Sequence, residues 1–456
     1  MGRRRTGVQD RDMLRLLGRV VHVERDELPA LGWTWLYFYA VLASYYVIRP
    51  IRDEAGVAGG VDNLPWLWTG TLIAVSISNP AFAALVGRLP RVKFVSWSYR
   101  FFALNLIVFF FVLRGATGAE NIWLGRVFYV WTAVFNLFVP SVFWAFMTDI
   151  FTRDQAKRLF GIISAAGTLG AMTGSILTAT LAAHIPPIYL LFCSAALIEL
   201  AVLAVRRLST LTESLRQVRA VASNEQIIGG SVVAGIRNAL KSPYLLGISF
   251  YMLMFTILST VLYFQQAGIV DRTFSDRAAR TVFFARVDLL TNALAFVLQI
   301  FAFGNLVKFI GVTLTLAVLP AVSAAGFGLL GIYPTVAAVV VFQAVRRAGN
   351  FAVARPTREV LFTVLPREDR YKTKNFIDTF VYRLGDQIGA WSQAALGAAG
   401  MGLVGMAWLA VPVSLVWLVN GMWLGRRQEK LAAAAVSPAL VPPAATASDA
   451  FVAARP

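Results

Sequence analysis

Twelve apolar stretches, each long enough to cross a bilayer as a helix, account for most of this 456-residue sequence. A spanning helix needs about 20 mostly apolar residues. The chain is 58% hydrophobic and only 14% charged, which is far from the composition of a soluble globular protein. We therefore predict an all-α polytopic membrane protein. The stretches lie near residues 30–52, 64–87, 95–113, 122–148, 159–183, 187–205, 244–266, 281–303, 309–330, 334–354, 375–398 and 401–424.

The distribution of basic residues predicts how these spans are oriented. An even number of spans places both termini on one side, and the connecting segments then alternate between the two sides. Most of the Lys and Arg residues outside the spans fall on the side that holds the termini, so the positive-inside rule makes that side cytoplasmic. The formal charge of +18 thus reflects topology rather than nucleic-acid binding. We expect a bacterial inner-membrane protein with both termini in the cytoplasm.

The longest internal polar segment lies between spans six and seven and divides the chain into two halves of six helices. We predict a cytoplasmic N-terminal segment with an amphipathic surface helix (1–29), a first half (30–206), an interdomain loop (207–242), a second half (243–425) and a disordered tail (426–456). Two six-helix halves resemble the major facilitator superfamily, in which the halves rock around a central site. A faint repeat supports the division, since Thr148, Leu169, Gly170 and Gly174 match Thr363, Leu384, Gly385 and Gly389 at one common offset.

Span ten carries charged residues at the depth of the bilayer centre. Gln343, Arg346, Arg347 and Asn350 share one polar stripe. A charged side chain there costs at least about 2.5 to 3.5 kcal/mol, so it needs a partner, a cavity or a function. The stripe is either a structural set that bonds to carbonyls or acids, or a binding site for an anion. We favour the anion site, because two adjacent buried arginines are hard to satisfy structurally.

Spans eight and eleven carry the acids. Asp288 and Asn292 share a face of span eight, and Asp288 is either a proton-accepting acid or a counter-ion for Arg346 or Arg347. In span eleven, Asp386 is deep enough to be functional, and a structural pair with Arg383 is the alternative.

The first span ends in "SYYVIRPIRDEAG", Ser44 to Gly56, on the side where the positive-inside rule gives no reason for arginines. Arg49, Arg52 and Asp53 lie at i, i+3 and i+4, so they share a face that could line a pathway, and Arg49 can pair with Asp53. Pro50 should weaken the helix at this point. The alternative is a plain polar stop at the membrane surface.

Several functional classes find no support in the sequence. One cysteine and two histidines leave no ligand set for a metal, and no nucleophile–base pair or P-loop is visible. The glycines of "GIISAAGTLGAMTGS", Gly167, Gly170 and Gly174, lie inside an apolar span and indicate close helix packing. We expect neither a cofactor nor an enzyme activity.

Four segments resemble the ATP/ADP translocase family of nucleotide exchangers. They are "YYVIRPIRD" (Tyr45–Asp53), "FWAFMTDIFTRDQAKRLFG" (Phe143–Gly161), "ARPTREVLF" (Ala354–Phe362) and "KTKNFIDTFVYRLGD" (Lys372–Asp386). The resemblance implies that Arg49, Arg52 and Asp53 belong to the substrate pathway. Arg52 stands where the family has a lysine, and Asp386 stands where it has a basic residue.

Together these features predict a secondary transporter that works by alternating access on an anionic or phosphorylated solute, with nucleotide exchange as one possibility. The alternatives are a proton-coupled carrier of a non-nucleotide solute and a non-transporting scaffold that kept the fold. We expect a monomer whose partners are the solute, a coupling ion or counter-substrate, and the bilayer. The predicted substrate contacts are Arg49, Arg52, Asn292, Arg346, Arg347 and Asn350, and the predicted coupling or counter-ion residues are Asp53, Asp288, Arg383 and Asp386.

Overall fold

The computed structural model describes residues 27–86, 91–151, 153–216, 242–301, 303–365, 373–374 and 376–436, and these form helices and the turns between them. Ten helices within this part of the chain are long and apolar enough to cross a membrane. The first half contains α2 (Leu28–Ala58), α3 (Leu64–Val86), α4 (Arg91–Gly115), α5 (Gly118–Ile150), α6 (Arg153–Leu181) and α7 (Leu190–Arg216). The second half contains α9 (Pro243–Thr273), α10 (Arg277–Phe301), α11 (Phe303–Ile332), α12 (Val336–Gly349), α13 (Arg355–Leu361), α15 (Tyr382–Ala398) and α16 (Leu403–Val436).

Two spans of the second half contain a π-helical turn. The segment η4 (Asn350–Ala354) joins α12 to α13, so these three elements form the tenth span. The segment η5 (Ile377–Val381) leads into α15 and completes the eleventh. Short 3₁₀ turns, η2 (Val61–Asn63) and η3 (Pro187–Tyr189), precede α3 and α7. Counted in this way, the described residues contain the twelve predicted spans.

Several helices extend further than the hydropathy pattern indicates. The first helix, α2, continues through Pro50 to Ala58. α7 continues to Arg216, into the expected loop, and α16 continues to Val436, so residues 426–436 of the expected disordered tail are helical. The predicted amphipathic helix near the N-terminus and the rest of the tail lie outside the described residues.

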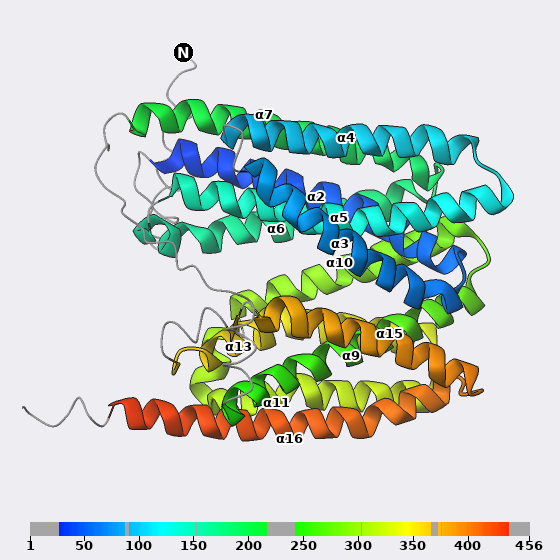
Figure 1. Cartoon of the computed structure of the whole chain (residues 1–456), viewed down its shortest axis with the longest axis vertical. Coiled ribbons are helices and arrows are strands. Elements are labelled where there is room, and N and C mark those ends of the chain that lie inside the picture. The colour runs from blue at the N-terminus through cyan, green and yellow to red at the C-terminus, as the bar shows by residue number, and fades with distance from the viewer. Residues whose placement is uncertain are drawn as a thin grey trace, which may run out of the picture.

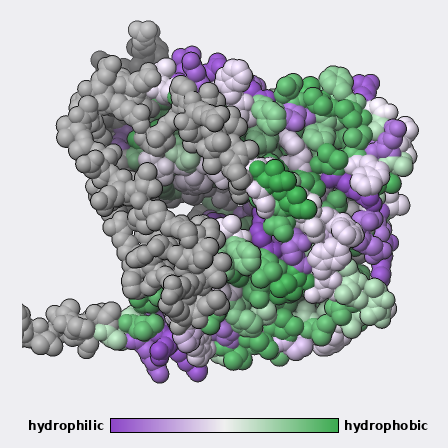
Figure 2. Space-filling model, in the orientation of Figure 1, coloured by the Kyte–Doolittle hydropathy of each residue, from purple (hydrophilic) through white to green (hydrophobic). Residues whose placement is uncertain are grey.

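The helices form two groups that face each other (Figure 1). One hydrophobic core takes its buried residues from positions 30–208, and a second takes them from positions 244–424 together with Val57, Leu64, Leu67 and Tyr129. Across the seam between the groups, α10 packs on α2 and α6, and α15 packs on α3. Figure 2 shows hydrophobic residues over much of both groups and hydrophilic residues where the groups meet.

Glycines set how closely the helices approach within each group. A Cβ atom on Gly170 of α6 would overlap the carbonyl oxygen of Tyr39 on α2. In the second group, a Cβ atom on Gly385 of α15 would overlap the hydroxyl of Thr256 on α9. The predicted role in helix packing is confirmed, and the two glycines matched by the sequence repeat hold equivalent helix pairs together.

Candidate functional site

Asp288 joins the two halves at the seam. Its Oδ1 lies 2.7 Å from Nη1 of Arg347 on α12 and 3.2 Å from Nη1 of Arg49 on α2. The carboxylate belongs to α10, so one acid from the second half forms an ion pair with one arginine from each half. The side chain of Asp288 is only 3% exposed. The structure therefore has the geometry of the counter-ion alternative for Asp288, with Arg347 as its partner within span ten.

A second carboxylate, Asp53, extends this arrangement along α2. Nη1 of Arg52 donates to its Oδ1 at 3.0 Å, and Nε of Arg49 lies 3.9 Å from its Oδ2. The hydroxyl of Tyr263 on α9 also donates to Asp53 Oδ1 at 3.2 Å. The predicted Arg49–Asp53 pair is therefore present. We call the set Arg49, Arg52, Asp53, Asp288 and Arg347 the central cluster.

Aromatic side chains contact the arginines of the central cluster. The guanidinium carbon of Arg52 lies 3.9 Å from the ring centroid of Tyr129 on α5, and that of Arg49 lies 5.5 Å from the ring of Tyr46. Such cation–π contacts contribute about 0.5–2 kcal/mol each, more when desolvated. The hydroxyl of Tyr129 donates in turn to that of Tyr263 at 3.3 Å. Five helices thus fix the positions of the charged groups.

The central cluster carries more positive than negative charge. Three guanidinium groups share two carboxylates, which leaves one positive charge in excess. Arg52 Nε, Arg347 Nη2 and Asp288 Oδ2 are buried and make no hydrogen bond. Buried polar atoms are nearly always paired, and an unpaired one costs about 1–3 kcal/mol. The two unused guanidinium donors and the excess positive charge suit an anion, whereas Asp288 Oδ2 is an unused acceptor.

Arg346 points away from the central cluster although it is the neighbour of Arg347. Its Nε donates to Ser323 at 3.0 Å, its Nη1 to Ser259 at 2.9 Å and its Nη2 to the carbonyl oxygen of Phe255 at 3.1 Å. These partners belong to α9 and α11, inside the second half. Successive helix residues differ by about 100° in direction, so the predicted stripe splits at this pair. The geometry favours the structural alternative for Arg346.

The other predicted site residues lie outside the ion pairs of the cluster. Asn292 donates to the backbone oxygen of Asp288, within its own helix, at 2.8 Å. Asn350 opens the π-helical segment η4, and its Oδ1 is buried without a partner. Asp386 pairs with Arg383 at 3.5 Å, as the spacing predicted. Within the described part of the chain, no ion pair connects this last pair to the central cluster.

Two kinds of contact, one across the seam and one inside the second half, were not predicted from the sequence. The first is the pair of tyrosines, Tyr129 and Tyr263, whose spacing gives no sign that they meet. The second is an amide pair, in which Gln343 of α12 donates to Gln266 of α9 at 2.6 Å. Phenols and amides inside apolar spans are the signal that would have identified these contacts.

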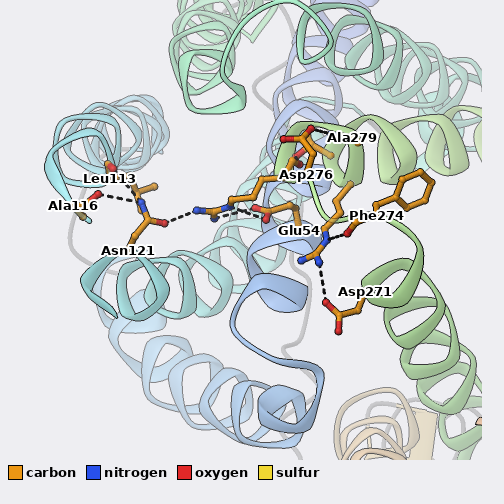
Figure 3. A network of polar contacts seen from close by, with 11 residues as sticks. Glu54, Leu113, Ala116, Asn121, Asp271, Phe274, Asp276 and Ala279 are labelled. Carbon is orange, nitrogen blue, oxygen red and sulfur yellow. Dashed lines mark hydrogen bonds and ion pairs between the residues drawn. The ribbon is translucent and has the colours of Figure 1, made fainter. Parts of the chain in front are cut away.

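Charged residues also connect the two halves at one end of the bundle, which we call the outer end, following the predicted orientation. Arg277 at the start of α10 donates to both oxygens of Glu54, at 2.8 and 3.1 Å, and to Asn121 Oδ1 at 2.5 Å (Figure 3). Glu54 lies on α2 and is 3% exposed, and Asn121 lies on α5. We call Glu54, Asn121 and Arg277 the outer latch. It joins one half to the other through a single arginine.

Comparisons with known proteins identify the fold. A scan against protein-family models and a search of curated proteins found no match. The chain is similar to the solved structure of a bacterial homologue of the iron transporter ferroportin in an inward-facing state, with a TM-score of 0.61, 13% identity, and coverage of 88% of this chain and 98% of that one. It is also similar to the nucleoside transporter NupG, with a TM-score of 0.52, 14% identity, and coverage of 90% and 99%.

A third similar structure is a bacterial homologue of the human lysosomal transporter Spinster, with a TM-score of 0.52, 13% identity, and coverage of 92% of this chain and 100% of that one. The fold is of the major facilitator type. The predicted fold class is therefore confirmed, with twelve helices in two groups of six. At these identities the likeness concerns the fold, and the resemblance to ATP/ADP translocases stays a prediction.

Proposed function

We propose that this protein is a secondary transporter that moves an anionic solute across the membrane by alternating access. The observation that carries the proposal is the central cluster, in which residues of both halves meet at the seam with one positive charge in excess. A solute held there contacts both halves at once. The solved structures of similar fold are transporters of different solutes, so they support transport and leave the solute open.

The shared carboxylate explains how the site can bind and release an anion. Without solute, Asp288 pairs with both Arg49 and Arg347, so neither cation lies in the membrane without a counter-ion. An incoming anion takes the place of Asp288 on one or both arginines. Because the carboxylate remains close by, it competes with the bound anion and favours release. This competition makes binding moderate, as a carrier requires.

A phosphorylated solute fits the cluster best within the anionic class. A guanidinium group binds a phosphate through two parallel hydrogen bonds, and Arg49, Arg52 and Arg347 offer three such groups. The resemblance to ATP/ADP translocases supports a nucleotide, while the acid at Asp386 departs from that family. We propose Asp53, Asp386 and Arg383 as the coupling or counter-ion residues, and residues 30–206 and 243–425 in the inner membrane as the two moving halves.

Ligand-dependent thermal unfolding tests the proposal without knowledge of the solute. The purified protein is heated with ATP, ADP, sugar phosphates, inorganic phosphate and short peptides, and the midpoint Tm is compared with that of the free protein. We expect at least one phosphorylated compound to raise Tm. Arg347→Gln should weaken that compound's affinity by about tenfold or more, because a hydrogen bond to a charged group contributes about 1.5–3 kcal/mol.

Arg286→Gln is the matched control, since Arg286 lies on α10 close to Asp288 but is exposed. It should respond to the compound as the wild type does. Stabilisation by neutral compounds alone, or an equal response of Arg347→Gln and the wild type, would contradict an anion site at the central cluster.

A further inference from the structure

An apolar groove lies between α3 and α4 on the flank of the first half, with α5 as its floor. Its volume is about 1100 Å³. It is lined almost entirely by apolar and aromatic side chains, among them Trp97, Phe101, Val130 and Trp131. None of its lining residues belongs to the central cluster or the outer latch, so the groove is a separate feature of the fold.

The shape of the groove follows from the course of its helices. α3 and α4 lie close together at one end and diverge towards the outer end, as Figure 1 shows. The lining begins at Asn63 and Arg126 near the outer end and reaches Ser78 on α3 and Phe94 on α4. From Leu64 to Ser78, α3 rises about 21 Å at about 1.5 Å per residue. The groove therefore runs through more than half of a hydrocarbon core that is about 30 Å thick.

The walls of the groove face the bilayer. Trp97 is 74% exposed and Trp123 is 64% exposed, although both are large and apolar. An apolar cavity does not hold water, so in a membrane the space has to be filled by hydrocarbon. Lipid chains are the hydrocarbon available there.

A cation with an unused hydrogen-bond donor lies at the outer end of the groove. Nη2 of Arg126 and Nδ2 of Asn63 both donate to the carbonyl oxygen of Gly59, at 2.8 and 3.0 Å. Arg126 Nε is buried and makes no hydrogen bond. Among the described residues no ion pair with an acid is found for Arg126, and its guanidinium carbon lies 4.9 Å from the ring of Trp123. A phosphate group is the natural partner for such a cation at the level of the lipid headgroups.

We propose that this groove binds one phospholipid, with its phosphate at Arg126 and its acyl chains between α3 and α4. The positive charge of Arg126 at one end of the groove matches the phosphate of the lipid headgroup. The apolar walls along the rest of the groove match the acyl chains. The site is independent of the proposed transport function, because it uses neither the arginines nor the acids of the seam.

Native mass spectrometry tests this site directly. The full-length protein is reconstituted in a mixture of phosphatidylethanolamine and phosphatidylglycerol, extracted in mild detergent, and weighed with its bound lipid. We expect one phospholipid per chain. Ala74→Phe, which fills the groove, should remove it, and Ile73→Phe, on the adjacent lipid-facing position that is 54% exposed, should not.

A second pair of variants separates the headgroup contact from the fit of the chains. Arg126→Gln should lower lipid occupancy about tenfold, since a charge-assisted contact is lost. Arg114→Gln, an exposed arginine in the last turn of α4, should leave it unchanged. A wild type without retained phospholipid overturns the proposal. So does equal lipid retention by Arg126→Gln and wild type, and so does a mass that shows a second copy of the chain in place of lipid.

Discussion

At the scale of single residues, the central cluster depends on Asp288. One oxygen of this carboxylate faces two guanidinium groups, Arg49 at 3.2 Å and Arg347 at 2.7 Å. Removing the acid leaves both arginines without that counter-ion, whereas removing one arginine leaves the acid still paired. The geometry therefore predicts that removing the acid costs more stability than removing one arginine. This ranking does not depend on the identity of the solute.

Asp288→Asn should therefore destabilise the protein more than Arg347→Gln. Breaking a buried ion pair by removing one partner costs about 3–5 kcal/mol, and Arg347→Gln should cost clearly less because Arg49 still neutralises Asp288. Thermal unfolding in detergent, followed by tryptophan fluorescence, gives the two Tm values. Equal losses, or a larger loss for Arg347→Gln, would show that Asp288 is not a shared counter-ion.

Arg346 and Arg347 should differ in function although they are neighbours. Arg346 is held by two serine hydroxyls and a carbonyl oxygen, so Arg346→Gln should lower Tm and leave anion affinity within about threefold of the wild type. Arg347→Gln should reduce anion affinity by about tenfold or more. Titration of both variants with the stabilising compound measures the difference, and a reversed order would assign the anion contact to Arg346.

At the scale of helices, close packing through glycine determines the pairs α2–α6 and α9–α15. Gly170 faces the backbone of α2, so a methyl group there must push the two helices apart. Gly161, further towards the start of α6, has open space around it. Substituting Gly170 and Gly161 of the same helix therefore compares a tightly packed position with an open one.

Gly170→Ala should destabilise the protein by about 1–3 kcal/mol, as expected for overpacking. Gly161→Ala should be neutral or stabilising by up to about 1 kcal/mol, because alanine is the better helix former. Chemical or thermal unfolding of the two variants checks the sign of each change. A Gly170→Ala protein as stable as Gly161→Ala would mean that α2 and α6 do not lie in close contact.

At the scale of the whole molecule, the outer latch holds the two halves together at one end. Arg277 of α10 bonds to Glu54 of α2 and Asn121 of α5. An alternating-access cycle must break these bonds whenever the outer end opens. Breaking the ion pair leaves the buried carboxylate of Glu54 without a counter-ion. Opening the outer end therefore costs free energy unless Glu54 gains a new partner or becomes hydrated.

Arg277→Gln should shift the population towards an open outer end by about tenfold, since it removes a charge-assisted contact of about 1.5–3 kcal/mol. Spin labels at Asp62 and Arg272, which are exposed and belong to different halves, report the separation by double electron–electron resonance after Cys193 is replaced by serine. Arg280→Gln is the control, because Arg280 bonds within the α9–α10 region, to Asp271 and Phe274. An unchanged distance distribution in Arg277→Gln would contradict a latch.

The sequence predicts local features of this molecule better than contacts between distant residues. Hydropathy located the spans, and the spacing of i, i+3 and i+4 located the pairs Arg49–Asp53 and Arg383–Asp386. The sequence left open whether Arg346 or Arg347 of span ten contacts Asp288. Adjacent residues of a helix lie at nearly the same depth and differ only in the direction in which their side chains point. The contact between Glu54 and Arg277 joins residues 223 positions apart in the sequence. No periodic pattern indicates a contact between residues so far apart along the chain.

Solute counterflow in proteoliposomes tests the central claim most directly. Vesicles loaded with an unlabelled anion from the phosphorylated panel are offered the same anion in labelled form, and accumulation is followed over time. We expect saturable uptake by the wild type and by Arg286→Gln, and a loss of about tenfold or more in Arg49→Gln and Arg347→Gln. Uptake at the wild-type rate by a correctly inserted Arg347→Gln protein would contradict an anion pathway through the central cluster.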